Sequence, residues 1–215
     1  MEDEHSMMKV LASPEEHELI TTNPDEMKSL NRPIKKPTST RDVNIRVDEY
    51  ERYFRKKKLN KDEVKYLLDE GYQVAKYKSL LTNKMETFLL QPRHNESLMH
   101  LFMTKNIAEY LEKNGIEVEL YVTVKPDIVF EIKGKRYAIE IETGSYLTRI
   151  KGLKEKVELL NQNYDKWFFV VTDRNLVTKY KEFGDSISAR YVKPRLNKLI
   201  KLVKTPKVRT PNFRV

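Results

Sequence analysis

The chain has 215 residues, of which 39% are hydrophobic and 34% are charged, and its formal net charge is +9. This composition suits one folded core with a small appendage and is not that of a disordered chain. The absence of cysteine excludes disulfides and thiolate metal sites. No apolar run approaches the roughly 20 residues of a membrane span, and acids stand at the N-terminus where a secretory signal carries positive charge. We therefore expect a cytoplasmic protein without a membrane partner.

The charge is unevenly distributed along the chain. Residues 1–31 hold eight acids and two lysines, whereas nine basic residues and no acid follow Asp185. A basic body attracts polyanions, and nucleic acid is the first candidate. The charge distribution alone is explained equally well by nucleic-acid binding and by a solvated surface with a basic tail.

The N-terminal part of the chain divides into two segments. Residues 1–44 are rich in Pro, Ser, Thr and charge without a sustained period, which predicts a flexible acidic tail or linker. An alternative is that this acidic segment folds back over a basic groove. Residues 45–91 predict a small helical or winged-helix-like module, and an extension packed on the core is the alternative.

Within that module the expected elements are short. Residues 47–57 indicate a charged helix. Asn60 and Glu63 have the spacing of a capping box, which predicts a second helix that ends near Gly71. Two short strands should follow, over residues 72–81 and 84–90.

Residues 92–192 predict an α/β core, a central mixed sheet flanked by helices. The apolar spacing predicts the order helix, three strands, helix, strand, helix, strand, over residues 95–114, 116–124, 126–132, 136–142, 149–165, 167–172, 175–183 and 187–192. Gly134 should form the turn between the second and third strands. Residues 193–215 are expected to be a basic C-terminal tail that includes a lysine-rich helix.

Three acids of this core point to metal chemistry. Asp127 begins one strand, and Glu140 and Glu142 lie near the end of its hairpin partner. Because residues i and i+2 of a strand face the same side, the two glutamates project together, and the hairpin can bring Asp127 beside them. Three carboxylates on a half-buried surface repel one another unless a cation joins them, and hard oxygen ligands suit Mg²⁺ or Mn²⁺. The alternative is that both glutamates line the solvent face of an edge strand.

The pattern of Pro126-Asp127, twelve further residues and then Glu140-Ile141-Glu142 resembles the PD-(D/E)xK nuclease superfamily. The resemblance covers about 80 residues, with an amphipathic helix before the motif and a helix and an apolar strand after it. It implies a restriction-endonuclease-like core and a divalent-metal-dependent DNA endonuclease that uses Mg²⁺ or Mn²⁺. The substrate would be duplex or branched DNA, and a homodimer is one assembly that the resemblance allows.

The resemblance also implies roles for single residues. Asp127, Glu140 and the backbone carbonyl of Ile141 would be metal ligands, and Glu96 would hold a water or a second metal. Glu142 stands where most members have lysine, which puts catalysis in doubt unless Glu142 serves as the base. Lys154 or Lys156 of the following helix would then supply the lysine, and we assign this role to Lys156.

More narrowly, the segments KPDIVFEIKGKRYAIEIETGS, LKEKVELLNQNYD and WFFVVTD are similar to the replication-relaxation proteins of bacterial mobile elements. This resemblance implies a substrate from a mobile element or phage. Two other classes of function stay open: a catalytically inactive DNA-binding or regulatory protein of the same fold, and an assembly protein. His94 and His100 also lie near Glu96, so a His-Glu-Asp metal site is a further alternative.

Overall fold

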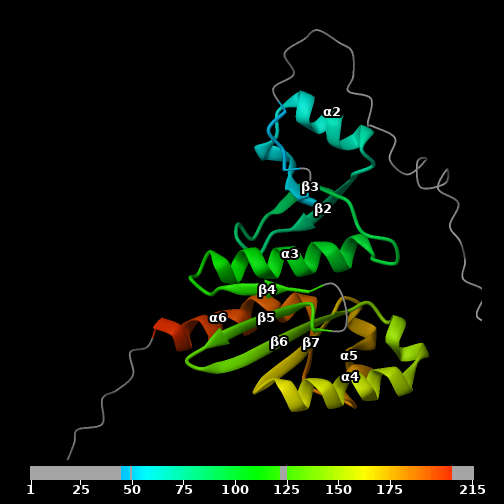
Figure 1. Ribbon diagram of the computed structural model, residues 1–215, viewed down its shortest axis with the longest axis vertical. Helices are drawn as coiled ribbons and strands as arrows, with labels where there is room; N and C mark the ends of the chain where they lie inside the picture. Colours follow the sequence, from blue (N-terminus) through cyan, green and yellow to red (C-terminus); the bar gives the residue numbers. More distant parts are fainter. Residues whose placement is uncertain (1–44, 49, 122–124, 205–215) are drawn as a thin grey trace, which may run out of the picture. The chain divides into compact units, whose positions relative to one another are not determined.

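The computed structural model describes residues 45–48, 50–121 and 125–204, which all belong to one compact unit (Figure 1). The tail predicted at residues 1–44 and residues 205–215 of the C-terminal tail lie outside the described residues. The described part is an α/β protein with one five-stranded mixed sheet and one three-stranded antiparallel sheet. Its strands and α-helices are, in chain order, β1 (Tyr53–Arg55), α2 (Lys61–Asp69), β2 (Gln73–Lys78), β3 (Met85–Leu90), α3 (Leu98–Glu112), β4 (Val118–Leu120), β5 (Ile128–Ile132), β6 (Lys135–Glu142), α4 (Ile150–Asn163), β7 (Lys166–Val171), α5 (Val177–Lys181), β8 (Ser186–Ser188) and α6 (Val192–Lys204).

The five-stranded sheet has the strand order β4-β5-β6-β7-β8, with β6 at its centre. Strands β4, β5 and β6 are antiparallel neighbours, whereas β6, β7 and β8 are parallel. Parallel neighbours need a crossover connection, which α4 and α5 provide. The α/β class, the hairpin and the crossovers predicted from the sequence are therefore confirmed.

The turn between β5 and β6 is two residues long and sets the register of the hairpin. Lys133 and Gly134 both have positive φ, 55° and 77°, as a type I′ turn requires. This turn pairs Ile132 with Lys135, and the register continues to Ile128 opposite Ile139. The same register decides which acids meet at the far end of the hairpin.

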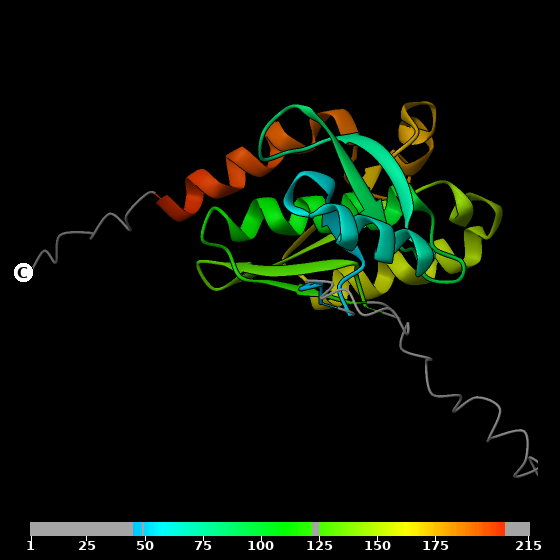
Figure 2. The ribbon, with the colours of Figure 1, turned by 90° about the horizontal axis from the view of Figure 1, so that it is seen from above.

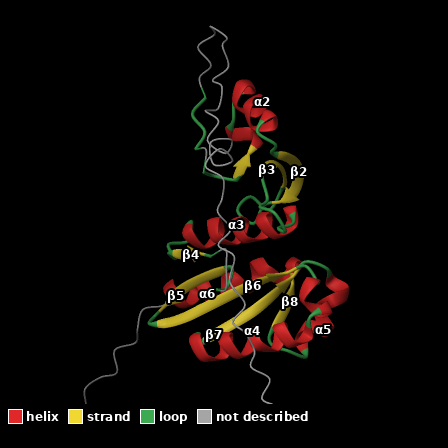
Figure 3. Ribbon diagram, turned by 45° about the vertical axis from the view of Figure 1, so that its right-hand side comes forward, coloured by secondary structure: helices red, strands yellow, loops and turns green. Residues whose placement is uncertain are grey.

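Helices cover both faces of the large sheet (Figure 3). Along β6, Tyr137, Ile139 and Ile141 belong to the apolar cluster that contains residues of α3 and α6. Ala138, on the opposite face, belongs to the cluster that contains residues of α4 and α5. Because side chains alternate along a strand, Glu140 shares the face of Ala138. Among the described residues, no helix has both the length and the apolar character that crossing a membrane requires.

The C-terminal end of the core differs from the sequence-based expectation. The strand expected at residues 187–192 is only Ser186–Ser188, and α6 begins at Val192. Leu196, Leu199 and Ile200 of α6 are buried in the main core. The lysine-rich helix expected within the tail is therefore present as α6, and its apolar side chains pack on the sheet.

The three-stranded sheet has the order β1-β3-β2 and lies between α2 and α3 (Figures 1 and 2). The capping box is confirmed, since Asn60 accepts from the Glu63 backbone and Glu63 accepts from the Asn60 backbone. The two predicted strands are confirmed as β2 and β3. The helix predicted over residues 47–57 is wrong, because residues 53–55 pair with β3 instead. Leu89 packs toward α2 and Phe88 toward α3, so this sheet joins the main core, as the alternative reading of the module expected.

Candidate active site

Asp127, Glu140 and Glu142 lie together where β5 and β6 run side by side. The register pairs Ile128 with Ile139, so the next pair along the strands is Asp127 with Glu140. Glu142 lies two residues beyond Glu140 and projects from the same face. Both glutamates are only 2% exposed. Since β6 is the central strand, the alternative of a solvent-facing edge strand is wrong.

Asp127 and Glu140 form a cross-strand pair without backbone hydrogen bonds between them. The Ile141 backbone N–H points toward Asp127, whereas the Glu142 carbonyl accepts from Thr172 on the other side. Backbone groups of successive strand residues alternate in direction, so those of Glu140 also point away from β5. Such pairs hold their side chains closest, with Cβ atoms about 4.5–5.5 Å apart.

The residues Pro126 and Asp127 leave one carbonyl oxygen facing the site. Asp127 Oδ2 accepts the Ile141 N–H at 2.7 Å. The N–H and carbonyl of one strand residue point the same way, so the Ile141 carbonyl also faces the β5 side. Pro126, which precedes Asp127 in the chain, has no N–H to donate to that carbonyl. A carboxylate and a backbone carbonyl therefore meet at the point predicted from the sequence.

Lys156 brings a positive charge to both glutamates. Its Nζ lies 2.7 Å from Glu140 Oε2 and 3.3 Å from Glu142 Oε1. It comes from α4, which covers this face of the sheet, and its Nζ also lies 4.5 Å from the centre of the Tyr146 ring. Lys154 is exposed. Of the two lysines that the sequence suggested, the structure therefore brings Lys156 to the acids.

Tyr180 is a member of the site that the sequence did not indicate. Its side chain is fully buried, and its hydroxyl donates to Glu142 Oε2 at 2.8 Å. Glu142 thus has a partner on each carboxylate oxygen, Lys156 on one side and Tyr180 on the other. A tyrosine at an apolar position of a short helix carries no sequence signal for this role, because the contact depends on how α5 packs on the sheet.

His100 lies between Asp127 and Glu96. Its Nε2 lies 3.2 Å from Asp127 Oδ1, and its Nδ1 lies 3.2 Å from Glu96 Oε1. Arg52 also pairs with Glu96, at 3.1 Å. His94 is exposed. Glu96 therefore reaches Asp127 through the His100 imidazole. Of the two histidines that the sequence suggested for a metal site with Glu96, the structure brings only His100 to this carboxylate.

Burial and charge shift the pKa values of this cluster in different directions. Desolvation raises the pKa of Glu140 to about 8, although Lys156 acts to lower it. Desolvation also raises the pKa of Glu142. The same effect would lower the pKa of Lys156, but the charges of Glu140 and Glu142 outweigh it and raise that pKa. Lys156 is therefore charged, and burial makes Glu140 easier to protonate than an exposed glutamate.

The pKa values around His100 show a strongly paired imidazolium. Desolvation would lower the pKa of His100, but its hydrogen bonds with Asp127 and Glu96 raise it to about 10. Desolvation would raise the pKa of Glu96, but the His100 hydrogen bond, the Arg93 backbone and Arg52 lower it to about 2. Desolvation is likewise overcome at Asp127, whose pKa is lowered, first by His100.

A charge count agrees with the raised pKa of Glu140. The cluster holds four carboxylates and three cations, namely Glu96, Asp127, Glu140 and Glu142 with Arg52, His100 and Lys156. With every group ionised the cluster would carry one net negative charge. A buried excess charge is costly, so a proton on one of the acids, or an added cation, relieves it.

No family model, curated protein or solved structure matches the chain. The chemistry that the site supports follows from its own donor atoms. Among the described residues, no group of three or more His, Asp or Glu side chains is arranged to hold a metal ion. Asp127, Glu140 and the Ile141 carbonyl do supply the hard oxygen donors that Mg²⁺ and Mn²⁺ prefer, and the charge excess is of the sign that a cation relieves.

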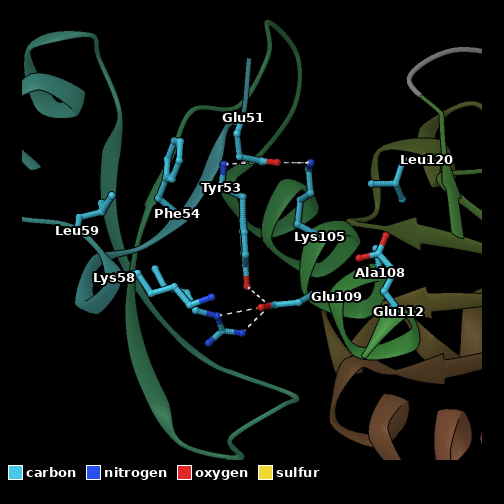
Figure 4. Close-up of a pocket in the computed structure, with 11 residues that line it drawn as sticks. Glu51, Tyr53, Phe54, Lys58, Leu59, Lys105, Ala108, Glu109, Glu112 and Leu120 are labelled. Atoms are coloured by element: carbon cyan, nitrogen blue, oxygen red, sulfur yellow. Dashed lines mark hydrogen bonds and ion pairs between the residues drawn. The ribbon is translucent and has the colours of Figure 1, made fainter. Parts of the chain in front are cut away.

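A second charged cluster joins β1 to α3 and lines a cavity of about 360 Å³ (Figure 4). Arg55 Nε donates to Glu109 at 3.2 Å, and the Tyr53 hydroxyl donates to the same carboxylate at 3.3 Å. Lys105 pairs with Glu51 at 3.1 Å. Acids and bases are paired with one another here, so this cluster fastens the small sheet to α3.

Proposed function

We propose that the chain is a divalent-metal-dependent DNA endonuclease that hydrolyses phosphodiester bonds. The observation that carries this proposal is the contact of Lys156 with both Glu140 and Glu142. In the PD-(D/E)xK pattern a lysine stands two residues after the second acid, and in this sequence that position, two residues after Glu140, is Glu142. A lysine that comes from α4 to the same carboxylates supports the resemblance where the motif itself departs from it.

In this proposal Asp127, Glu140 and the Ile141 carbonyl hold Mg²⁺ or Mn²⁺. The ion would share or replace the contacts that Lys156 now makes with Glu140 and His100 makes with Asp127. When bound, it would polarise the phosphoryl oxygens and offset the charge that develops on them. Glu96 acts through His100, as a positioning residue for Asp127 rather than as a metal ligand.

Lys156, Glu142 and Tyr180 handle the proton of the attacking water and the negative charge that develops on the phosphoryl group. Lys156 donates a hydrogen bond to the phosphoryl group and stabilises its developing negative charge. Glu142, whose pKa burial raises, accepts the proton of the attacking water, since a carboxylate with a raised pKa is a stronger base. Tyr180 holds the other oxygen of Glu142 and fixes its orientation.

The substrate class rests on charge and on the resemblance. The resemblance to the PD-(D/E)xK nucleases implies a mixed sheet that is flanked by helices and carries its acids on a hairpin, and this chain has such a core. The body of the chain is also basic. We therefore assign DNA, duplex or branched, of a mobile element or phage. A cytoplasmic location and a homodimer that cuts both strands belong to the same proposal.

Calorimetric titration of Mn²⁺ and Mg²⁺ into the wild-type protein and Asp127→Ala tests the site directly. The proposal expects binding to the wild type and its loss in the variant, because Asp127 supplies a ligand oxygen. Glu119→Ala, which removes an exposed acid from the neighbouring strand, is the matched control and should bind as the wild type does. Equal binding to all three proteins would contradict a metal at Asp127.

A catalytically inactive DNA-binding protein is the second candidate function. It is favoured because the residues of the site already pair with one another. His100 pairs with Asp127, and Lys156 pairs with Glu140. In that case the cluster stabilises the fold, and DNA binding would fall with salt but be unaffected by a chelator. Salt-dependent binding together with no metal uptake would select this candidate over the nuclease.

A further inference from the structure

A cavity of about 340 Å³ lies beside the acid cluster, on the side of α4. Its wall includes Glu140 and Lys156 of the candidate active site. It also includes Lys125 and Arg136, which come from the start of β5 and from β6. Cations thus outnumber acids three to one among the charged residues of the wall, which favours a negatively charged ligand.

Neither the Lys125 nor the Arg136 side chain pairs with a carboxylate among the described residues, and both side chains are exposed. The Arg136 backbone N–H donates to Asp165 Oδ2 at 2.8 Å. Each cation lies over an aromatic ring instead. Lys125 Nζ is 4.2 Å from the centre of the Tyr121 ring, and the Arg136 guanidinium carbon is 5.0 Å from that of Tyr164. The cavity shown in Figure 4 differs, because the three cations of its wall, Arg55, Lys58 and Lys105, are balanced by the three glutamates Glu51, Glu109 and Glu112.

The other wall residues suit a flat, partly apolar group. Leu160 is buried below the cavity, whereas Leu159 is 46% exposed beside it. Tyr164 adds an aromatic ring at the carboxyl end of α4. Proteins bind single-stranded nucleic acid by combining cations for the phosphates with aromatic or apolar side chains for the bases. A volume near the lower limit of about 300 Å³ for ligand pockets fits one small molecule and excludes a duplex.

We propose that this cavity takes one unpaired nucleotide of a DNA strand. Lys125 and Arg136 bind its phosphate, and its base packs against Leu159 and Tyr164. The neighbouring phosphodiester then lies at Glu140, which rests on the proposed nuclease function. The expected consequence is a preference for single-stranded, flapped or forked DNA over a continuous duplex.

Binding without metal tests the cavity apart from the chemistry. A fluorescent eight-residue oligothymidylate is titrated with the full chain in EDTA, and anisotropy gives the dissociation constant. Arg136→Ala and Tyr164→Ala should each weaken binding about fivefold or more, the usual loss for one stacked or cationic contact. Leu159→Asp should weaken it further by adding an acid beside the phosphate. Lys135→Ala removes the neighbouring exposed cation and should bind as the wild type does.

The outcomes separate the cavity from the nuclease. If Lys135→Ala binds the oligonucleotide normally and Arg136→Ala does not, the cavity is supported even when no cleavage is found. If the wild type cleaves DNA but Arg136→Ala, Tyr164→Ala and Leu159→Asp all bind like it, the cavity proposal is overturned and the nuclease stands. An eight-base-pair duplex bound more tightly than the oligothymidylate, or no binding at low salt, would also overturn it.

Discussion

Lys156 Nζ of helix α4 lies 2.7 Å from Glu140 Oε2 of strand β6, two side chains that are 20% and 3% exposed. The contact joins the crossover helix to the central strand at the point where the acids gather. Burying a charged lysine there costs free energy, because desolvation would lower the pKa of Lys156. Glu140 and Glu142 offset this cost, since their charges raise that pKa. This pair is the element of the site on which both stability and chemistry should depend.

Replacing Lys156 should affect both properties at once. Lys156→Met keeps the length of the side chain but leaves Glu140 and Glu142 without their cation. Breaking a buried pair by removing one partner costs about 3–5 kcal/mol, and we expect that loss in the free energy of unfolding measured with urea. Lys154→Met, on the exposed side of the same helix, should stay within about 0.5 kcal/mol of the wild type. Equal stabilities of the two variants would show that the contact contributes nothing.

Tyr180 should contribute through its hydroxyl alone. Tyr180→Phe keeps the ring in the core and removes the donor to Glu142 Oε2, so one buried carboxylate oxygen loses its partner. Such a loss costs about 1–3 kcal/mol, measurable by urea unfolding. Tyr191→Phe, at a tyrosine that is 55% exposed, is the control and should be neutral. A neutral Tyr180→Phe would mean that Glu142 does not need this donor.

His100 should make stability depend on pH above neutrality. Its pKa is about 10 in the folded chain and about 6.5 when unfolded, so the folded state holds the extra proton between these values. Its contribution is fully present below the unfolded pKa and is lost as pH rises through 10. Thermal melts between pH 6 and 10 should show that slope, and His100→Gln should flatten it.

The acid limb of the same profile should come from Glu96. Its folded pKa of about 2 lies below the ordinary value of 4.5, so its contribution is present above 4.5 and is lost as pH falls through 2. Glu140 acts in the opposite sense, because its pKa of about 8 makes folding less favourable as pH rises from 4.5 to 8. Glu96→Gln should reduce the acid limb, part of which remains because the pKa of Asp127 is also lowered. An unchanged limb would contradict the pairing of Glu96 with His100 and Arg52.

Arg55 should hold the small sheet to α3. It is 5% exposed and donates to Glu109 and to Ser79. Arg55→Ala leaves the partly buried Glu109 without its cation, and we expect a loss of about 3–5 kcal/mol in unfolding free energy. Lys57→Ala nearby removes a more exposed charge and should cost at most about 1 kcal/mol. Similar effects of the two variants would argue against a structural role for this cluster.

Local patterns in the sequence were sufficient for the hairpin and for the acid cluster. Gly134 with alternating residues on both sides fixes the register, and the register alone brings Asp127 opposite Glu140. The resemblance suggested Lys154 or Lys156 of the helix after the motif, and the structure brings Lys156 to the acids. Local patterns failed where long-range packing decides: residues 53–55 look helical but pair with β3, and α6 looks like a tail but fills the core.

The contacts that the sequence did not predict join residues far apart in the chain. Tyr180 meets Glu142 across 38 positions, and Arg55 meets Glu109 across 54. Neither pair has a periodic signal, because each depends on the path of the chain between its members. His100 is an intermediate case between local and long-range contacts. Its contact with Glu96, four residues away, is local, whereas its contact with Asp127 is long-range.

Cleavage of DNA by matched variants tests the central claim most directly. Supercoiled plasmid, single-stranded and branched DNA are incubated with the wild type, Asp127→Ala, Lys156→Met and the control Lys154→Met, in Mn²⁺, Mg²⁺ or EDTA. The nuclease proposal predicts metal-dependent cleavage by the wild type and Lys154→Met, and none by Asp127→Ala or Lys156→Met, with folding of each variant checked by circular dichroism. A wild type inert on every substrate with both ions, or Asp127→Ala cutting at the wild-type rate, would contradict it.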